Sequence, residues 1–430
     1  LSLAYFKSDK PQASAQKKMI VVLPFENLSH PEDEYVTDGF TDEITNRLSA
    51  LQGLGTISRT SAMRYKKTGK TLRQIGNELG VDYVLEGSVR WNRIAGDPSG
   101  PEGGRMRVTA QLIRVADDIH IWAETYEQDI ENVFAVQTWI AEQVAQKLDL
   151  TLLAPEREAL EDRPTANLRA YDYYLRGRKL EYRGWIEWKR EDFLSAAEMF
   201  QKAVDLDPKF AVAYSQLSII NSRCFFFGID RTEQRLAQAG AAAQKALELN
   251  PKLPDGKKAL DIYYYWGFLD YDRAVDLLES LRKPWPNLPL EMLGYIARRQ
   301  GRWDEALKTL MEAHKLNPQY AQLTYEIGLC HMALRKYEEA ESWMNRCIAI
   351  NPRQLTAHLQ KATIAILAHG DMDNAQDGLR SLPSHPLTDY ALLTVDLMAG
   401  RNKEALGRLK SLDYEQYQEQ HLYFHKDLAY

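Results

Sequence analysis

The sequence has few cysteines, no long apolar run and no excess of basic residues. Its three cysteines, Cys224, Cys330 and Cys347, are too few for a disulfide framework, so we interpret them as small buried hydrophobic residues. No run of about 18 apolar residues occurs, so the sequence predicts no membrane-spanning helix. The formal net charge of -6 argues against binding to nucleic acid through a basic surface.

The usual catalytic motifs are also missing. There is no nucleophile elbow, zincin or kinase signature. The Gly-rich stretch Ala95–Gly104 lacks a Gly-Lys-Ser/Thr ending, so a hairpin turn is the simpler interpretation. Asp38, Asp42 and Glu43 cluster near a helix start, where the helix dipole favours carboxylates without a metal. His421 and His425 have helical spacing but no third ligand. The sequence therefore predicts no catalytic residue, cofactor or metal.

Two copies of one pattern lie back to back in Leu288–Pro352. Each copy has a glycine, a small alanine, two further apolar residues and a proline, and the second copy follows the first by 34 residues. The matching residues are Gly294, Ala306, Leu310, Ala313 and Pro318, then Gly328, Ala340, Met344, Cys347 and Pro352.

The spacing has a physical interpretation as a pair of packed helices. The glycine lies where the second helix touches the first, and the alanine lies where the two helices cross. The proline follows Leu-Asn or Ile-Asn and ends the second helix, because proline cannot continue it. A 34-residue period of this kind resembles the tetratricopeptide repeat (TPR), a helix–turn–helix unit that stacks on copies of itself.

Weaker copies extend the pattern in both directions, so we expect an all-α superhelical TPR solenoid of six to seven repeats over residues 166–430. The first repeat carries an insertion at Tyr182–Lys189, and the second is stretched around Phe225–Thr232. A last pair is expected at Tyr390–Leu412, followed by Asp413–Tyr430 as a capping helix or a truncated eighth repeat.

The residues before the solenoid predict one α/β domain, a mixed sheet with flanking helices, over residues 18–150. Residues 1–17 and 151–165 are predicted to be linkers, the second with a helix extension as the alternative. The expected strands are Lys18–Phe25, Thr56–Tyr65, Val81–Trp91, Arg105–Val115 and Ile119–Tyr126, and the expected helices are Tyr35–Leu51, Thr71–Leu79 and Ile130–Leu150.

This domain resembles the TolB-like or FlgO-like domain of bacterial proteins. The resemblance rests on VVLPFENLS (Val21–Ser29), EYVTDGFTDEI (Glu34–Ile44), ISRTSAMRYK (Ile57–Lys66), IGNELGVDYVLEGSVR (Ile75–Arg90), RVTAQLI (Arg107–Ile113) and HIWAETYEQD (His120–Asp129). The chain departs from the family by its longer hairpin at residues 95–104. The resemblance implies TPR repeats after the domain and a place in membrane-anchored signalling proteins, such as receptor-type Ser/Thr kinases, adenylate cyclase-like proteins or winged-helix regulators.

The concave face of the solenoid is the predicted binding site, because the first helix of each TPR repeat lines that face. Tyr, Trp and Arg are the residue types that dominate binding hot spots. An extended or helical peptide with acidic residues would suit them; the alternative is that several of these tyrosines pack between repeats. The predicted residues are Tyr171, Tyr174, Arg178, Tyr182, Tyr263, Trp266, Glu291, Tyr295, Arg298, Arg299, Gln322, Tyr325 and Met332.

Three hypotheses on function remain open at this point. The chain is a non-enzymatic interaction or sensory module such as a free-standing periplasmic adaptor, the regulatory half of a signalling enzyme with a kinase or cyclase upstream, or an α/β domain that binds a small ligand or nucleotide on a TPR scaffold. The apolar start Leu1–Phe6, without an initiator Met, is what a fragment downstream of a membrane anchor or signal peptide would show. The resemblance favours the periplasmic face of a bacterial inner membrane over the cytoplasm. The sequence leaves the oligomeric state open.

Overall fold

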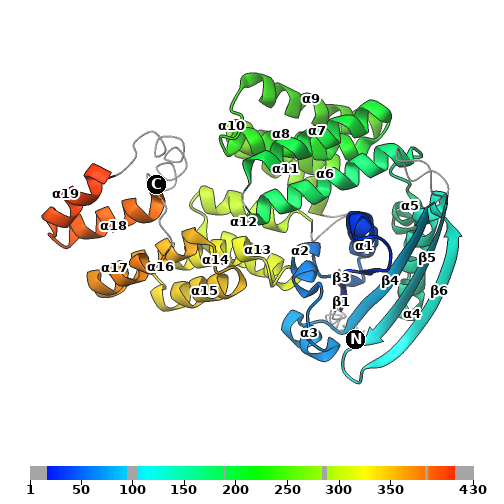
Figure 1. Ribbon diagram of the computed structural model, residues 1–430, viewed down its shortest axis with the longest axis horizontal. Helices are drawn as coiled ribbons and strands as arrows, with labels where there is room; N and C mark the ends of the chain where they lie inside the picture. The colour runs from blue at the N-terminus through cyan, green and yellow to red at the C-terminus, as the bar shows by residue number, and fades with distance from the viewer. Residues whose placement is uncertain (1–16, 94–103, 188, 283–287, 383–385, 412–430) are drawn as a thin grey trace, which may run out of the picture.

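The computed structural model describes residues 17–93, 104–187, 189–282, 288–382 and 386–411. Within these residues an α/β part comes first and a long series of helices follows (Figure 1). The expected fold class, a mixed sheet with flanking helices followed by helical repeats, is therefore confirmed.

The sheet has six strands, five of them in the order β3-β1-β4-β5-β6. Strands β1, β3 and β4 run parallel, whereas β4, β5 and β6 form an antiparallel meander, and β2 pairs with β4 at one end. The strands are β1 (Lys18–Val22), β2 (Glu26–Asn27), β3 (Leu54–Thr56), β4 (Tyr83–Arg93), β5 (Gly104–Arg114) and β6 (Ile119–Asp129).

Successive side chains of a buried strand point to opposite faces of the sheet, so each strand contributes to two hydrophobic cores. Ile20 and Val22 pack on one face with α1 (Glu34–Ser49) and α4 (Val133–Lys147). Val21, between them, packs on the other face, where α2 (Arg59–Ala62) and α3 (Leu72–Leu79) lie. Short 3-10 turns η1 (Pro31–Asp33), η2 (Met63–Tyr65) and η3 (Ile130–Asn132) complete the domain.

The predicted strand Thr56–Tyr65 is wrong beyond its first residue, because β3 ends at Thr56 and α2 begins at Arg59. Ser58 is the reason: its backbone is extended and its side chain accepts a hydrogen bond from the Ser61 N–H, which starts a helix. The predicted helix after Thr71 is confirmed. Thr71 caps α3 in a capping box with Gln74, and Gly80 ends it with φ 67°.

Seven successive helix pairs follow in the part of the chain that the structure describes. A separate short helix, α5 (Ala154–Glu161), occupies the predicted linker before them. The pairs are α6 (Leu168–Glu187) with α7 (Arg190–Leu206), α8 (Ala211–Phe226) with α9 (Glu233–Leu249), α10 (Pro254–Phe268) with α11 (Tyr271–Arg282), α12 (Leu290–Arg299) with α13 (Trp303–Leu316), α14 (Ala321–Ala333) with α15 (Tyr337–Ile350), α16 (Leu355–His369) with α17 (Met372–Arg380), and α18 (Pro386–Met398) with α19 (Asn402–Ser411).

The repeated glycines and alanines lie where the two helices of a pair meet. A Cβ added to Gly294 would come within 2.5 Å of the Leu310 side chain, and one added to Gly328 would come within 2.7 Å of Met344. Ala306 and Ala340 are fully buried. The period thus records a close approach that only small residues permit, as the spacing predicts. The hairpin at residues 95–104 and the residues after Ser411, including His421 and His425, lie outside the described residues except for Gly104.

The α/β domain and the first helix pairs share one hydrophobic core. The core that contains Phe40 of α1 and Phe134 of α4 continues through Phe200 of α7 to Phe210 and Cys224 in the second pair. The later pairs have smaller cores of their own. The N-terminal third of the solenoid therefore folds against the α/β domain.

Candidate interaction surface

The helix pairs curve around the α/β domain, and its helix α1 lies against the first helix of the series, α6 (Figure 1). The concave face, which the sequence predicts to be the partner site, thus already has a protein element against part of it. Two contact regions can be distinguished, one at α6 and one at the loop between α13 and α14.

Tyr171 and Tyr174 are buried in the shared core and do not line an open groove. Tyr171 lies edge-on to Phe134 of α4, with ring centroids 4.8 Å apart, and Tyr174 packs on Phe200 and Phe210. Burial raises the pKa of both hydroxyls. These two tyrosines join the α/β domain to the first repeat.

On α6, Arg178 contacts the acidic face of α1, and Tyr182 contacts Arg59 of α2. Arg178 forms an ion pair with Asp42 at 3.2 Å and donates a hydrogen bond to the Tyr174 hydroxyl at 3.1 Å. Asp42 also pairs with Arg59 at 2.9 Å, and the Arg59 guanidinium lies 4.9 Å from the centre of the Tyr182 ring. The carboxylate that the sequence explains by the helix dipole is therefore also bound by two arginines.

The same helix–helix contact contains a close approach and a tyrosine–carboxylate hydrogen bond. A Cβ added to Gly39 of α1 would come within 2.4 Å of Leu175 on α6, so glycine lets the two helices touch. The Tyr35 hydroxyl donates a hydrogen bond to the Asp172 carboxylate. Burial and that neighbouring carboxylate together raise the pKa of Tyr35 to about 12. Sequence reasoning missed Tyr35, Gly39 and Leu175, which no periodicity marks.

Arg223 of the second pair lies between one aromatic ring of the first pair and one of the third. The Arg223 guanidinium lies 5.1 Å from the centre of the Trp185 ring and 5.8 Å from the centre of the Trp266 ring. Trp266 in turn stacks on Phe226, with ring centroids 5.2 Å apart. The predicted residue Tyr263 lies elsewhere: it packs against Gly240 of α9, between two helices.

The predicted residues of the fourth repeat bind one another and their neighbours. Tyr295 donates a hydrogen bond to Glu291 at 2.9 Å. Arg298 forms an ion pair with Glu326 on α14 at 2.5 Å. Arg299 donates to the hydroxyl of Tyr265 on α10 at 2.6 Å. Burial raises the pKa of Glu291 and raises that of Tyr265 to about 12.

In the fifth repeat Gln322 donates a hydrogen bond to Glu326 at 2.8 Å and accepts one from Gln354, the residue before α16. Tyr325 is 9% exposed and packs in the core between the fifth and sixth pairs, which Met332 also contacts. Most of the predicted set is therefore brought together in space, but its side chains chiefly contact each other or the α/β domain.

The second contact region is polar and lies where α13 ends. The Ser58 N–H donates to the Leu316 carbonyl at 2.9 Å, and the Ser61 hydroxyl donates to the Asn317 side chain at 2.7 Å. The Ser61 hydroxyl also accepts from the Gln319 N–H at 3.0 Å. We call Ser58, Ser61, Leu316, Asn317 and Gln319 the latch. The sequence contains one signal for it, the polar Asn317 before the helix-ending proline, but Asp207, Asn250 and Asn351 precede prolines at other repeat ends.

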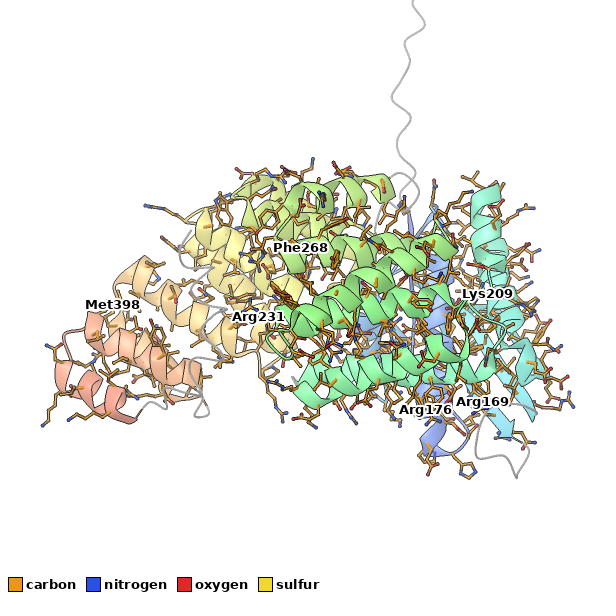
Figure 2. All side chains as sticks on the ribbon, turned by 90° about the horizontal axis from the view of Figure 1, so that it is seen from above. Arg169, Arg176, Lys209, Arg231, Phe268 and Met398 are labelled. Atoms are coloured by element: carbon orange, nitrogen blue, oxygen red, sulfur yellow. The ribbon has the colours of Figure 1, made fainter. Side chains whose placement is uncertain are left out.

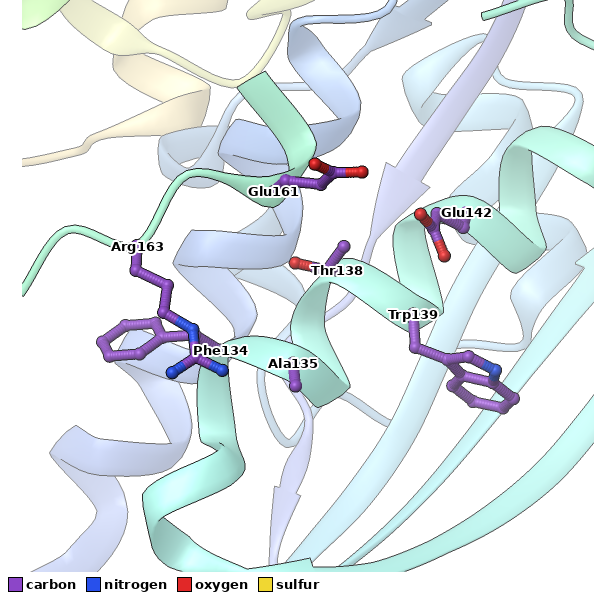
Figure 3. A pocket seen from close by; sticks show the side chains of 7 residues that line it. All are labelled: Phe134, Ala135, Thr138, Trp139, Glu142, Glu161 and Arg163. Carbon is purple, nitrogen blue, oxygen red and sulfur yellow. The ribbon is translucent and has the colours of Figure 1, made fainter. Parts of the chain in front are cut away.

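A shallow hollow of about 220 Å³ lies on the outer side of α4 (Figure 3). It is lined by Phe134, Ala135, Thr138, Trp139 and Glu142 of α4 and by Glu161 and Arg163. Small-molecule sites are usually larger, about 300–1,000 Å³. Within the described residues there is no group of three or more His, Cys, Asp or Glu side chains that could hold a metal, and no helix is long and apolar enough to cross a membrane.

Comparison with known proteins identifies the repeats. A family model described as tetratricopeptide repeat matches residues 291–354. The chain is 34% identical over 261 residues to a Rhizobium meliloti (strain 1021) protein named "Putative adenylate cyclase 3", a match that covers 60% of this chain. The chain spans only 42% of the length of that relative.

Two solved structures show similarity in fold alone. Human IFIT1, solved as a dimer with m7Gppp-AAAA, matches with 19% identity and a TM-score of 0.47, over 66% of this chain and 64% of that one. The pilF protein of Pseudomonas aeruginosa matches with 18% identity and a TM-score of 0.38, over 48% of this chain and 96% of that one. The family-model match and the 34-residue period agree that the helical region contains tetratricopeptide repeats.

Proposed function

We propose that this chain is a non-catalytic interaction region of a longer bacterial signalling protein, with a TPR solenoid that binds a protein partner on its concave side. One observation carries the proposal: the concave side already binds the acidic face of α1 through Arg178, and the latch holds residues Ser58–Ser61 of the α/β domain against the loop after α13. Arginine and tyrosine contacts of that kind are typical of protein–protein interfaces.

The α/β domain is proposed to be TolB-like and to have a sensory role. The segments that carry the resemblance fall on β1, α1, α3 with β4, β5 and β6 in order, which supports the assignment. Because this domain and the first repeats share a core, a ligand or partner that shifts the sheet would also shift α6. The signal is thereby passed to the solenoid without a catalytic step.

We also propose that the longer protein contains a catalytic domain outside this chain. The relative named as an adenylate cyclase is more than twice as long as the part that this chain matches. A kinase or cyclase domain would then receive the signal that the repeats transmit. The corresponding test is the intact mass and peptide map of the native protein: a heavier species with catalytic peptides supports this proposal, and a species of this chain's mass contradicts it.

Because the α/β domain lies against the first repeats, we expect a partner to bind the concave side of the last repeats. Met332 lies near the end of α14, a first helix, and is partly buried. Leu367 lies at the corresponding end of α16 and is 54% exposed; Leu397 and Met398 end α18 and are each 56% exposed. Figure 2 shows Met398 at the opposite end of the molecule from Arg176, which lies beside the α/β domain. A partner segment with an apolar face would suit these side chains.

The experiment that tests the groove is site-specific photo-crosslinking in the native cell. A photoreactive residue is placed at Leu367 or Met398, and a matched control replaces exposed Glu338 on the second helix α15. A defined protein adduct at the two first-helix positions and none at Glu338 supports the proposal. Equal adducts at all three positions, or none at the first-helix positions, contradict it.

A further inference from the structure

The two edges of the β-sheet differ in length and in cover. Strand β3 forms one edge with only three residues, and the latch lies directly after it at Ser58. Strand β6 forms the other edge with eleven residues, and among the described residues no strand pairs with its outer side (Figure 1). A long open edge offers a row of backbone N–H and C=O groups to another chain.

The outer part of β6 has regular geometry. Residues Trp122–Asp129 pair without a break with Arg105–Leu112 of β5. Near the start of the strand the register shifts, and Ile121 has no partner residue on β5, which is the pattern of a β-bulge. Eight consecutive residues therefore present an unbroken edge, without a proline to interrupt it.

The edge is acidic. From Val115 to Gln146 the sequence has no lysine or arginine. This stretch covers all of β6 and nearly all of α4. Its acidic residues are Asp117, Asp118, Glu124, Glu127, Asp129, Glu131 and Glu142. Arginines of β5 already pair with Asp117 and Glu127, so the proposal relies on the other carboxylates, chiefly Glu124 and Glu142.

The hollow in Figure 3 adjoins this edge through Trp139. The Trp139 ring lies 4.3 Å from Tyr126 and 5.5 Å from Trp122 between ring centroids, and both partners are on β6. Glu142 lies one helical turn further along α4 and also lines the hollow. An aromatic surface beside a carboxylate binds both the apolar stem and the ammonium group of a lysine.

We propose that β6 binds an extended, basic segment of a partner protein, which adds to the sheet as a further strand. Backbone hydrogen bonds along Trp122–Asp129 supply the affinity, and the acidic side chains select lysine or arginine in the added strand. A lysine on the face towards α4 lies over Trp139. A second copy of this chain is disfavoured, because it would bring the carboxylates of two β6 strands together.

The test measures binding of three synthetic eight-residue peptides to the full chain. The first alternates lysine with valine and threonine; the second has glutamate for lysine; the third keeps the lysines but is N-methylated on every residue, which removes the backbone donors of both edges. The first peptide is expected to bind and to protect the amides of residues 122–129 from hydrogen exchange. The other two are expected to bind at least about tenfold more weakly.

Two double variants of the chain test whether the effect of charge on peptide binding is specific to the β6 edge. Glu124→Lys with Glu142→Lys should weaken the basic peptide about tenfold, since two partly exposed charge contacts are lost. Glu338→Lys with Glu339→Lys, both exposed on α15, makes the same charge change elsewhere and should leave binding unchanged. No binding of the basic peptide, equal binding of the N-methylated peptide, or protection outside β6 would each overturn the proposal.

Discussion

The two ends of the solenoid are built from the same repeat but are stabilised differently. The first two pairs share a core with the α/β domain, and that core includes the fully buried Phe193, Phe200 and Phe210. The last pairs have a small core of Leu, Val and Ala, with Leu397 and Met398 exposed beside it. Repeats depend on their neighbours for burial, so an end with an additional domain against it is stabilised more than one without.

The largest effect is expected from Phe200→Ala in the shared core. Phe200 is fully buried and fills the space above Gly177, where an added Cβ would come within 2.6 Å of its ring. Loss of the ring should cost about 3–5 kcal/mol of unfolding free energy. Denaturation followed by hydrogen exchange should show β4 and α6 losing protection together. Loss in α6 alone would contradict a shared core.

Asp396→Asn tests the other end. Asp396 is fully buried between Arg401 and Arg408, at 3.1 and 2.8 Å. Removal of its charge leaves two guanidinium groups without their buried partner, at a cost of about 3 kcal/mol. We expect α18 and α19 to lose exchange protection while the α/β domain keeps it. Asp373 also pairs with Arg401 but is largely exposed, so Asp373→Asn should have little effect on stability.

The latch offers a matched pair of substitutions at equivalent repeat positions. Asn317 accepts from Ser61 in the α/β domain, whereas Asn351, 34 residues later, has a side-chain hydrogen bond to nearby Gln354. Asn317→Ala should cost about 1–2 kcal/mol, because it leaves buried hydroxyls without an acceptor. Asn351→Ala should cost less. Equal losses in thermal denaturation would show that the latch does not hold the two regions together.

The smallest effect is a pH dependence at His314 in the middle of the solenoid. Burial lowers the pKa of His314 to about 4, and its ring lies edge-on to Trp343. Between pH 6.5 and 4 the unfolded chain binds the proton and the folded chain does not, so stability falls as the pH falls. We expect wild type to lose on the order of 1–2 kcal/mol relative to His314→Leu across this range. A difference that does not change with pH would contradict the assignment.

Sequence patterns were most informative where the contact is local. Gly294 with Leu310 and Gly328 with Met344 are contacts within one helix pair, and the 34-residue period predicts both. Thr71 and Gly80 mark the ends of α3 by their own backbone chemistry. The strand predicted at Thr56–Tyr65 is wrong beyond Thr56, because Ser58 caps the helix that begins at Arg59.

The predicted binding residues show the limit of that reasoning. The period assigns Tyr171, Arg178 and Arg299 to one face of the solenoid without stating what lies against them. In the structure the first two contact the α/β domain, and Arg299 binds Tyr265 of another repeat. Whether any of the predicted set binds a partner therefore stays a prediction, and the exposed ends of α16 and α18 are the better place to look.

The sequence by itself determined the repeat, its helix boundaries and the class of the N-terminal domain. These follow from packing between residues close in sequence, which leaves a period in the residue types. Only the tertiary structure decided which part of the concave face remains open. The latch joins Ser61 to Asn317, and the α1 contact joins Asp42 to Arg178. Such pairs lie far apart in the chain, and they form only when two finished surfaces meet, so no local pattern records them.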